Sequence, residues 1–302
     1  MTTTALPTEA DVVAAARRIK PYVRRTPVMD VVIDGQPVVF KLEHLQLTGS
    51  FKLRGALNAL LSDQRPDLVI TASGGNHGLA VATAAALLDL PAVVYVPETV
   101  PDAKARRIEA TGAHLIRFGS RYADAATAAQ AAATSPGSRY LPAYDDAGVI
   151  AGQATVAAEV VADRPDVDAL VIAVGGGGLA AGATIGGGGR PVLAVEPDGC
   201  CCLHDALAAG EPVDTVVSSV AASALGATRV GTLPFELLRG ARSSLVSDEE
   251  LLAARDRLWE EFRLAVEPAA AVPFAALLSG QVAGALPCLV LCGANTDWRP
   301  SD

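Results

Sequence analysis

Aromatic side chains are scarce in this 302-residue chain: they make up only 4% of it, although 51% of the residues are hydrophobic. The apolar interior must therefore be built mainly from alanine, valine and leucine. Continuous runs of aliphatic residues are typical of parallel strands that are buried on both faces and covered by helices. The composition thus predicts a parallel α/β protein, and the length allows a large core or two domains.

An excess of positive charge is also absent. The chain carries 24 Lys and Arg residues against 33 Asp and Glu residues, which gives a formal net charge of −9, and no basic cluster offsets this balance. Nucleic acids and anionic membranes attract basic surfaces. The composition therefore argues against both as partners.

Long unbroken apolar segments and paired cysteines are missing as well. The uncharged stretches 169–189 and 269–295 are interrupted by glycine or proline, so neither supplies the roughly 20 apolar residues of a spanning helix. The N-terminus shows no basic segment followed by an apolar one, so no secretory signal is predicted. Five cysteines, three of them consecutive at 200–202, indicate reduced thiols and favour small buried side chains over a metal site. We expect a cytoplasmic protein.

Strand and helix patterns alternate along most of the chain. Within residues 67–143 the expected strands are 68–72, 92–96 and 114–118, and the helices that follow them are 78–88, 102–110 and 122–134. Such alternation is typical of βαβ units and a parallel sheet. A second series surrounds this block, with strands at 169–174, 192–195 and 289–292 and helices at 151–162, 248–263 and 269–278. The sequence therefore predicts a small inserted domain, 67–143, in a larger domain formed by 1–66 and 144–302.

Three segments carry residues suited to chemistry. Lys52 follows a strand-like run at 38–43, the segment Ser73-Gly74-Gly75-Asn76-His77-Gly78 follows strand 68–72, and Gly175–Gly178 follows strand 169–174. A lysine amine forms imines with carbonyl compounds, and glycine loops at helix N-termini bind anions through backbone N–H groups. The glycine quartet matches neither G-x-G-x-x-G nor a nucleotide P-loop. Together the segments predict a phosphate-bearing aldehyde cofactor.

In this order, the three segments resemble the fold-type II pyridoxal-phosphate enzymes, and within them the serine/threonine dehydratase branch. The resemblance covers nearly the whole chain, from Ala14–Ile19 and Arg25-Thr26-Pro27 to Leu291–Asn295. Its most specific part is Ser50-Phe51-Lys52-Leu53-Arg54-Gly55, because these dehydratases carry Ser-Phe-Lys-x-Arg-Gly, whereas cysteine and threonine synthases usually follow the lysine with Asp-Arg. The resemblance implies a tryptophan synthase beta-like α/β fold. Two doubly wound, mostly parallel sheets would then flank a cofactor cleft between a large and a small domain.

The resemblance also implies roles for individual residues. Lys52 would be the catalytic residue, joined to pyridoxal 5'-phosphate as an imine, with Phe51 beside the ring. The other cofactor contacts would be Asn76 at the ring hydroxyl, Gly175, Gly176, Gly177, Gly178 and Leu179 at the phosphate, and Cys292 at the pyridine nitrogen. The substrate carboxylate would be held by Ser73, Gly74, Gly75, Asn76 and His77, together with Arg121.

These roles imply a pyridoxal-phosphate-dependent ammonia-lyase that converts L-serine, L-threonine or a related β-hydroxy amino acid to a 2-oxo acid and ammonia. Cys292 favours this reaction, because a neutral thiol leaves the ring a weaker electron sink than an aspartate would and so favours rapid loss of a β-leaving group. Two alternatives stay open: β-replacement or elimination on another β-substituted amino acid, and a cofactor-binding homologue without turnover. Relatives are commonly dimers, so we expect a homodimer.

Three departures from the family pattern refine the prediction. Racemases of the family place a serine directly after the position of Ser73, but here that residue is Gly74, so we expect racemisation to be weak or absent. The family's divalent-metal site has acidic residues at the positions of Glu196 and Cys202, and hard cations prefer oxygen to sulfur, so we expect no Mg²⁺ activation there. Ala222-Ser223 replaces a common Asp-Gly beside the substrate pocket, which leaves the preferred side chain open.

Overall fold

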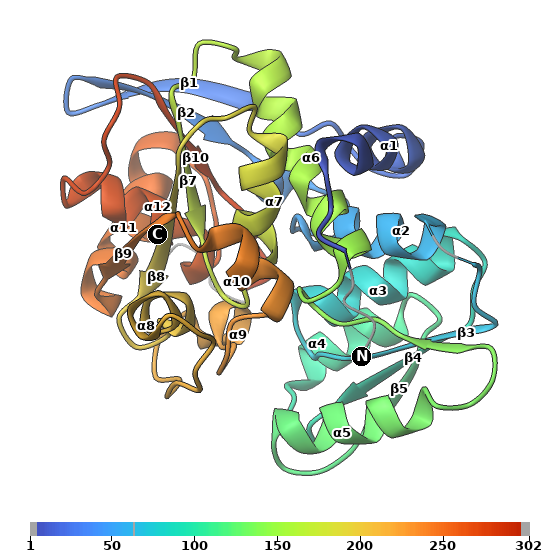
Figure 1. The fold of residues 1–302 in the computed structure, drawn as a ribbon. Coiled ribbons are helices and arrows are strands. Elements are labelled where there is room, and N and C mark those ends of the chain that lie inside the picture. The colour runs from blue at the N-terminus through green and yellow to red at the C-terminus, as the bar shows by residue number, and fades with distance from the viewer. Residues whose placement is uncertain (1–4, 63, 297–302) are drawn as a thin grey trace.

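Two sheets organise the structure, a computed structural model that describes residues 5–62 and 64–296 (Figure 1). In this part of the chain the larger sheet has six strands in the order β1-β2-β10-β7-β8-β9, and the smaller has four in the order β5-β4-β3-β6. Every neighbouring pair is parallel except β1 and β2. The predicted fold class, two mostly parallel sheets in an α/β protein, is confirmed.

The strands are short, and those in the middle of each sheet are the most buried. Those of the larger sheet are β1 (Val28–Ile33), β2 (Gln36–Lys41), β7 (Ala169–Ala173), β8 (Val192–Pro197), β9 (Arg242–Val246) and β10 (Pro287–Val290). Those of the smaller sheet are β3 (Leu68–Ala72), β4 (Ala92–Val96), β5 (His114–Arg117) and β6 (Ser138–Tyr140). The central strand β7 is buried at every position, as expected for an aliphatic strand covered on both faces.

The helices are α1 (Glu9–Ile19), α2 (Lys52–Ser62), α3 (Asn76–Leu87), α4 (Asp102–Glu109), α5 (Tyr122–Ala132), α6 (Ala147–Asp163), α7 (Gly178–Gly186), α8 (Cys202–Ala209), α9 (Ala222–Leu225), α10 (Thr232–Leu238), α11 (Asp248–Phe262) and α12 (Pro268–Leu278). Helices and strands alternate from α2 to β8, after which three helices follow β8 and two follow β9. Figure 1 shows α6 running between the two sheets, with α7 on one side and α1 and α2 on the other. None of the described helices is long and apolar enough to cross a membrane.

Each sheet has its own apolar core, and the boundary between the cores is informative. The core of the smaller sheet includes Val69 and Ala80, but it also takes in Ile19, Leu53 and Val149 from α1, α2 and α6. These three helices lie outside the segment 67–143, so this cluster is shared with the rest of the chain, whereas a smaller cluster around Ile70, Ala72 and Ala129 lies wholly within the segment. The boundaries of the two domains stay a prediction.

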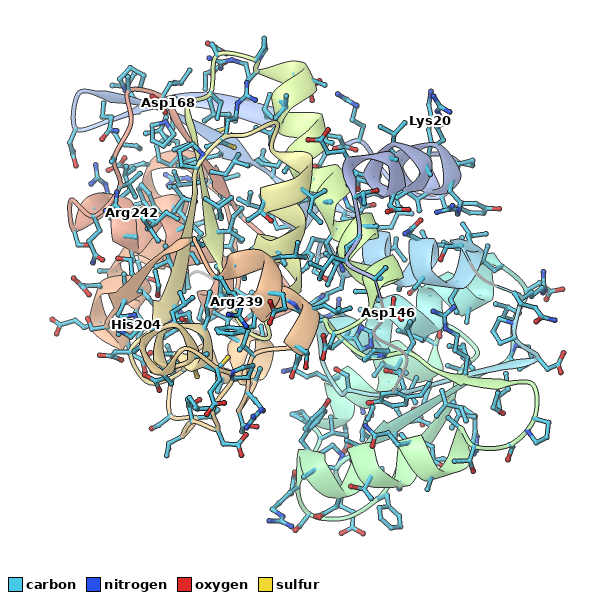
Figure 2. All side chains as sticks on the ribbon, in the orientation of Figure 1. Lys20, Asp146, Asp168, His204, Arg239 and Arg242 are labelled. Carbon is cyan, nitrogen blue, oxygen red and sulfur yellow. The ribbon has the colours of Figure 1, made fainter. Side chains whose placement is uncertain are left out.

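Most expected elements are present with shifted ends. Strands 68–72 and 92–96 have the predicted bounds, whereas the helix expected at 151–162 already begins at Ala147. The cause is Asp146, whose Oδ1 accepts a hydrogen bond from Val149 N at 2.8 Å and caps the helix where the chain leaves the smaller sheet (Figure 2). The strand expected at 289–292 is β10, which ends at Val290, so that Cys292 stands just beyond the end of the strand.

Candidate active site

The residues to which the sequence assigns a role all line one cavity of about 630 Å³. Its walls come from both sheets: from the segments after β3 and β4 on one side, and from those after β7 and β10 on the other. In a parallel sheet the carboxyl ends of the strands lie at one edge, so ligands bind outside that edge. The structure thus brings together segments that are more than 200 residues apart in the sequence. Their individual roles stay predictions.

Lys52 is the first residue of α2, and backbone contacts hold it beside the end of β10. Ser50 pairs with Gly293, and Phe51 N donates to Cys292 O at 3.2 Å. The Lys52 Nζ donates to Ala143 O at 2.8 Å and lies 5.2 Å from the centre of the Phe51 ring. Burial lowers the pKa of Lys52 to about 8, although Cys292 opposes the shift. At pH 7 about a tenth of such an amine is uncharged, far more than for an ordinary lysine, so Lys52 is suited to act as a nucleophile or base.

A buried ionic network holds α2 in place at Arg54, two residues after Lys52. Arg54 donates to Glu43 at 2.8 and 2.9 Å and to Glu159 Oε1 at 2.8 Å. Lys41 Nζ donates to Glu159 Oε2 at 2.6 Å. The side chains of Arg54, Glu43 and Lys41 are fully buried. This network joins the start of α2 to β2 and α6, and so fixes the position from which Lys52 enters the cavity.

The segment Ser73–His77 forms the turn between β3 and α3. Ser73 Oγ accepts from Gly75 N at 3.2 Å, and α3 begins at Asn76, so unpaired N–H groups of its first turn lie beside the cavity. His77 Nε2 lies 3.0 Å from Leu141 O, and because that carbonyl only accepts, Nε2 carries the hydrogen. Burial, and next the charge of Lys52, lower the pKa of His77 to about 3. His77 is therefore neutral and fixes the loop rather than transferring protons through Nε2.

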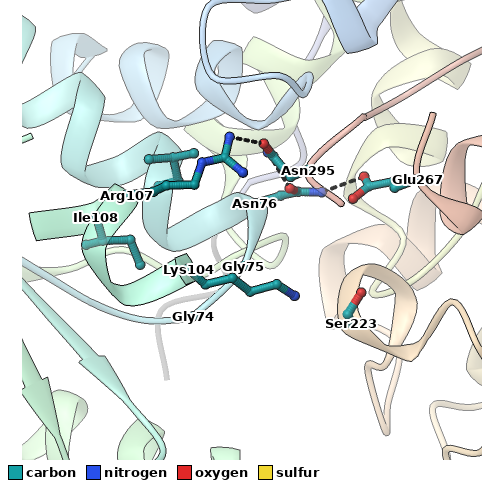
Figure 3. Close-up of a pocket in the computed structure, with 10 residues that line it drawn as sticks. Gly74, Gly75, Asn76, Lys104, Arg107, Ile108, Ser223, Glu267 and Asn295 are labelled. Carbon is teal, nitrogen blue, oxygen red and sulfur yellow. Dashed lines mark hydrogen bonds between the residues drawn. The ribbon is translucent and has the colours of Figure 1, made fainter. Parts of the chain in front are cut away.

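The side-chain amide of Asn76 is oriented by two neighbours that come from the other side of the cavity (Figure 3). Its Nδ2 donates to Glu267 Oε1 at 2.7 Å, and its Oδ1 accepts from Asn295 Nδ2 at 2.6 Å. Asn295 Oδ1 in turn accepts from Arg107 of α4 at 2.6 Å. One N–H of Asn76 stays available to a ligand. A Cβ at Gly293 would lie 2.0 Å from Glu267 Oε1, so only glycine permits Glu267 to reach Asn76.

Sequence reasoning missed Glu267 as a member of this site. The signal that was present is a single carboxylate placed directly before the uncharged segment 269–295. Glu267 is 3% exposed, and carboxylates at such positions are nearly always paired. Its partner Asn76 could not be identified from the sequence, because 191 positions separate the two residues.

Glu267 should make stability depend on pH in a way that glutamine does not. Burial raises the pKa of Glu267 to about 7, although Asn76, Lys104 and Arg107 oppose the rise. The folded protein then holds this proton more tightly than the unfolded chain, whose carboxyl has the ordinary value of 4.5. Its contribution is therefore present below pH 4.5 and is lost as the pH rises through about 7, a change of about 3 kcal/mol.

The measurement is urea unfolding at pH 5 and pH 8. We expect Glu267→Gln to become more stable relative to the wild type as the pH rises, because glutamine still accepts from Asn76 and does not titrate. Glu109→Gln, at the exposed end of α4, is the matched control and should follow the wild type. Parallel stability profiles for the wild type and Glu267→Gln would contradict the prediction.

The glycine quartet forms a cradle that side chains would fill. Gly177 has a φ of +94° and caps α7, which favours glycine. A Cβ at Gly176 would lie 2.2 Å from the ring of Tyr144, and one at Gly175 would lie 3.0 Å from the Leu225 Cα. The first N–H groups of α7 have no partner within the helix and suit a phosphate. One member of the cysteine triplet supports this loop, because Cys202 Sγ donates to Gly175 O at 3.3 Å.

Of two other predicted site residues, Cys292 is buried and Arg121 is exposed. Cys292 is 4% exposed, and burial raises the pKa of its thiol well above the usual range, so the thiol stays neutral. Arg121 lines the cavity at its rim, where its side chain is 77% exposed and pairs with Asp124 at 3.1 Å. A role for Arg121 at the substrate carboxylate stays a prediction.

Glu196, which stands where the family's metal site has an acidic ligand, stabilises the start of a helix in this structure. Glu196 accepts from Leu203 N at 2.9 Å and from His204 N at 2.8 Å, and it thereby caps the start of α8. Burial raises the pKa of Glu196 to about 8. Across residues 5–62 and 64–296, no group of three or more His, Cys, Asp or Glu side chains is placed to hold a metal ion.

Residues 19–293 match the protein family described as "Pyridoxal-phosphate dependent enzyme". The chain belongs to this family. The L-threonine ammonia-lyase of Geobacter sulfurreducens is 38% identical over 88% of this chain and 69% of its own length. The L-threo-3-hydroxyaspartate ammonia-lyase of Saccharomyces cerevisiae is 34% identical over 97% and 95%. The structure of maize serine racemase has a TM-score of 0.91 and 28% identity, covering 97% of this chain and 95% of that one.

These similarities confirm the cofactor, the fold-type II class and the resemblance to the dehydratase branch of pyridoxal-phosphate enzymes. The cavity of this pyridoxal-phosphate enzyme also fits the cofactor on its own chemistry. It offers an amine with a lowered pKa, a glycine cradle at a helix N-terminus and an oriented amide. Lys52 would hold the aldehyde carbon, Asn76 the ring hydroxyl and Gly175–Leu179 the phosphate, while Cys292 would lie at the ring nitrogen.

Proposed function

We propose that this pyridoxal-phosphate enzyme is an ammonia-lyase that removes water from a β-hydroxy amino acid and releases ammonia and a 2-oxo acid. The observation that carries the proposal is the single cavity shared by Lys52, the Ser73–His77 turn, the glycine cradle and Cys292. The ammonia-lyases named above support it, and L-threonine and L-serine are the first substrates to examine.

Different residues of the chain have different roles in this reaction. When bound, the cofactor supplies an electron sink that acidifies the α-C–H bond of the amino acid. Lys52 Nζ removes the α-proton, for which its lowered pKa suits it. The backbone N–H groups and the hydroxyl of the Ser73–His77 turn bind the carboxylate. The neutral thiol of Cys292 adds no positive charge at the ring nitrogen, which favours elimination over prolonged carbanion lifetimes.

The test follows 2-oxo acid and ammonia from L-serine and L-threonine, beside the visible absorbance of the cofactor. Equal amounts of both products, with an absorbance change on mixing, support the lyase. A product that forms only when a thiol is added would favour β-replacement instead. An absorbance change with no product would favour a binding protein without turnover.

Racemisation is the alternative raised by the serine racemase neighbour, and Gly74 argues against it. Glycine has no group that donates or accepts a proton on the ring face opposite Lys52. The structure adds a steric reason, because a Cβ at Gly74 would lie 2.5 Å from Val100 Cγ2. We expect Gly74→Ser alone to give little D-serine from L-serine, and Gly74→Ser with Val100→Ala to give at least about tenfold more, since a positioned acid or base contributes roughly 10²–10⁴-fold.

Chiral chromatography of the reaction mixture measures this effect. Val100→Ala alone is the control and should form no more D-serine than the wild type. Rapid racemisation by the wild type would contradict both the prediction and the assigned importance of Gly74.

We propose in addition that the protein acts in the cytoplasm as a homodimer. Five free cysteines suit a reducing compartment. Light scattering coupled to size-exclusion chromatography tests the dimer, and a mass of one chain at micromolar concentration would contradict it.

A further inference from the structure

One cation of the active-site cavity has no hydrogen-bond partner among the described residues, although its charge acts on Glu267. Lys104, on α4, lines both the large cavity and a smaller adjoining pocket, which share Gly74, Gly75 and Ser223. Figure 3 shows its side chain extending from α4 toward Ser223 on α9. Lys104 is partly buried, and among the described residues no side chain or carbonyl forms a hydrogen bond or ion pair with its ammonium group. A partly buried ammonium group without a hydrogen-bond partner is stabilised when an anion binds beside it.

The other charged groups of the cavity are already engaged. Lys52 donates to Ala143 O, and Arg121 pairs with Asp124 at the solvent-exposed rim. Arg107, which lines the smaller pocket, donates to Asn295. Glu267 is the one carboxylate among the described lining residues; its Oε1 accepts from Asn76, and the charge of Lys104 lowers its pKa. This end of the cavity therefore has an excess of positive charge beyond what Lys52 and the carboxylate-binding turn require.

Ser223 places a hydroxyl on the wall opposite Lys104. Its carbonyl oxygen would lie 3.2 Å from a Cβ at Gly75, so α9 packs directly against the turn assigned to the substrate carboxylate. An ammonium group supplies three donors and a serine hydroxyl supplies one. The two side chains together can bind both oxygens of a carboxylate next to that turn.

We propose that Lys104, with Ser223, binds a second carboxylate, carried on the β-carbon of the substrate. The enzyme would then act best on an acidic β-hydroxy amino acid of the 3-hydroxyaspartate type. This inference rests on the proposed function, because it takes the Ser73–His77 turn as the site of the α-carboxylate. Lys104 is a specificity-determining residue and takes no part in proton transfer.

The test compares two ligands that differ in charge and hardly in shape. Isothermal titration calorimetry of the cofactor-loaded protein measures the Kd of L-aspartate and of L-asparagine. We expect the wild type to bind L-aspartate at least about tenfold more tightly, since hydrogen bonds to charged groups are the strong ones. Lys104→Met should remove this preference, and Ser223→Ala should reduce it.

Arg106→Met is the matched control, because Arg106 lies on the same helix, is exposed and lines neither cavity. It removes the same charge from α4 and should leave the preference for L-aspartate unchanged. A second readout is kcat/KM for 3-hydroxyaspartate against L-threonine, whose ratio should fall at least about tenfold in Lys104→Met.

Two outcomes would overturn the inference: equal weakening of both ligands in Lys104→Met, or no preference for L-aspartate in the wild type, including the case in which neither ligand binds. A wild type that forms no 2-oxo acid from any substrate would instead refute the proposed function. The two failures are separable, because calorimetry needs no turnover.

Discussion

Replacement of Lys52 by alanine is expected to lower the rate of 2-oxo acid formation by at least about 10²–10⁴-fold, the contribution of a positioned acid or base. The amine is both the group that attaches the cofactor and the base that takes the α-proton, so the loss should fall on kcat. Its surroundings support this double role, because burial lowers the pKa of Lys52 to about 8. A rapid-mixing assay with L-threonine measures the effect.

The control is Lys20→Ala, at the exposed end of α1 on the outer surface of the molecule (Figure 2). It removes the same side chain and should leave kcat unchanged. Borohydride reduction followed by peptide mapping provides a readout that does not depend on activity, and we expect the cofactor label on Lys52. Label on another lysine, or full activity in Lys52→Ala, would remove the basis of the proposed mechanism.

The site could be predicted from the sequence where glycine and a reactive side chain lie close together in the chain. Lys52, the turn at 73–78 and the quartet at 175–178 each follow an aliphatic strand, and strand ends of parallel sheets meet at one edge. Local pattern was therefore enough to place these segments around one cavity. It was not enough for Glu267 or Lys104, whose importance depends on contacts with distant elements.

The same difference between local sequence patterns and contacts with distant strands decides which strands could be predicted. The strand-like run at 38–43 corresponds to β2, but β1 and the hairpin that joins them were not predicted. The pair Asp34-Gly35 is nevertheless a signal for a two-residue turn, and both residues have positive φ. Strands β6 and β9 were also missed. They are held by pairing with β3 and β8, and their own residues are only partly buried, so their sequences lack a clear apolar pattern.

Replacement of Arg54 by alanine is expected to destabilise the protein by about 3–5 kcal/mol, the usual effect of removing one partner of a buried ion pair. The carboxylate of Glu43 would remain fully buried without its bidentate partner. Urea unfolding measures the change. Arg25→Ala is the matched control, because the Arg25 side chain is 56% exposed in its pair with Asp163, which should contribute no more than about 1 kcal/mol.

The dependence of this loss on pH identifies its cause. Burial alone would raise the pKa of Glu43, but the charge and hydrogen bonds of Arg54 outweigh it and hold the pKa below the ordinary 4.5. The contribution of the pair is therefore present above pH 4.5 and is lost as the pH falls toward the lowered value. The difference between the wild type and Arg54→Ala should be largest near neutral pH and shrink in acid. A difference that stays constant down to pH 3 would mean that packing of the long side chain, and not its charge, secures the start of α2 and with it Lys52.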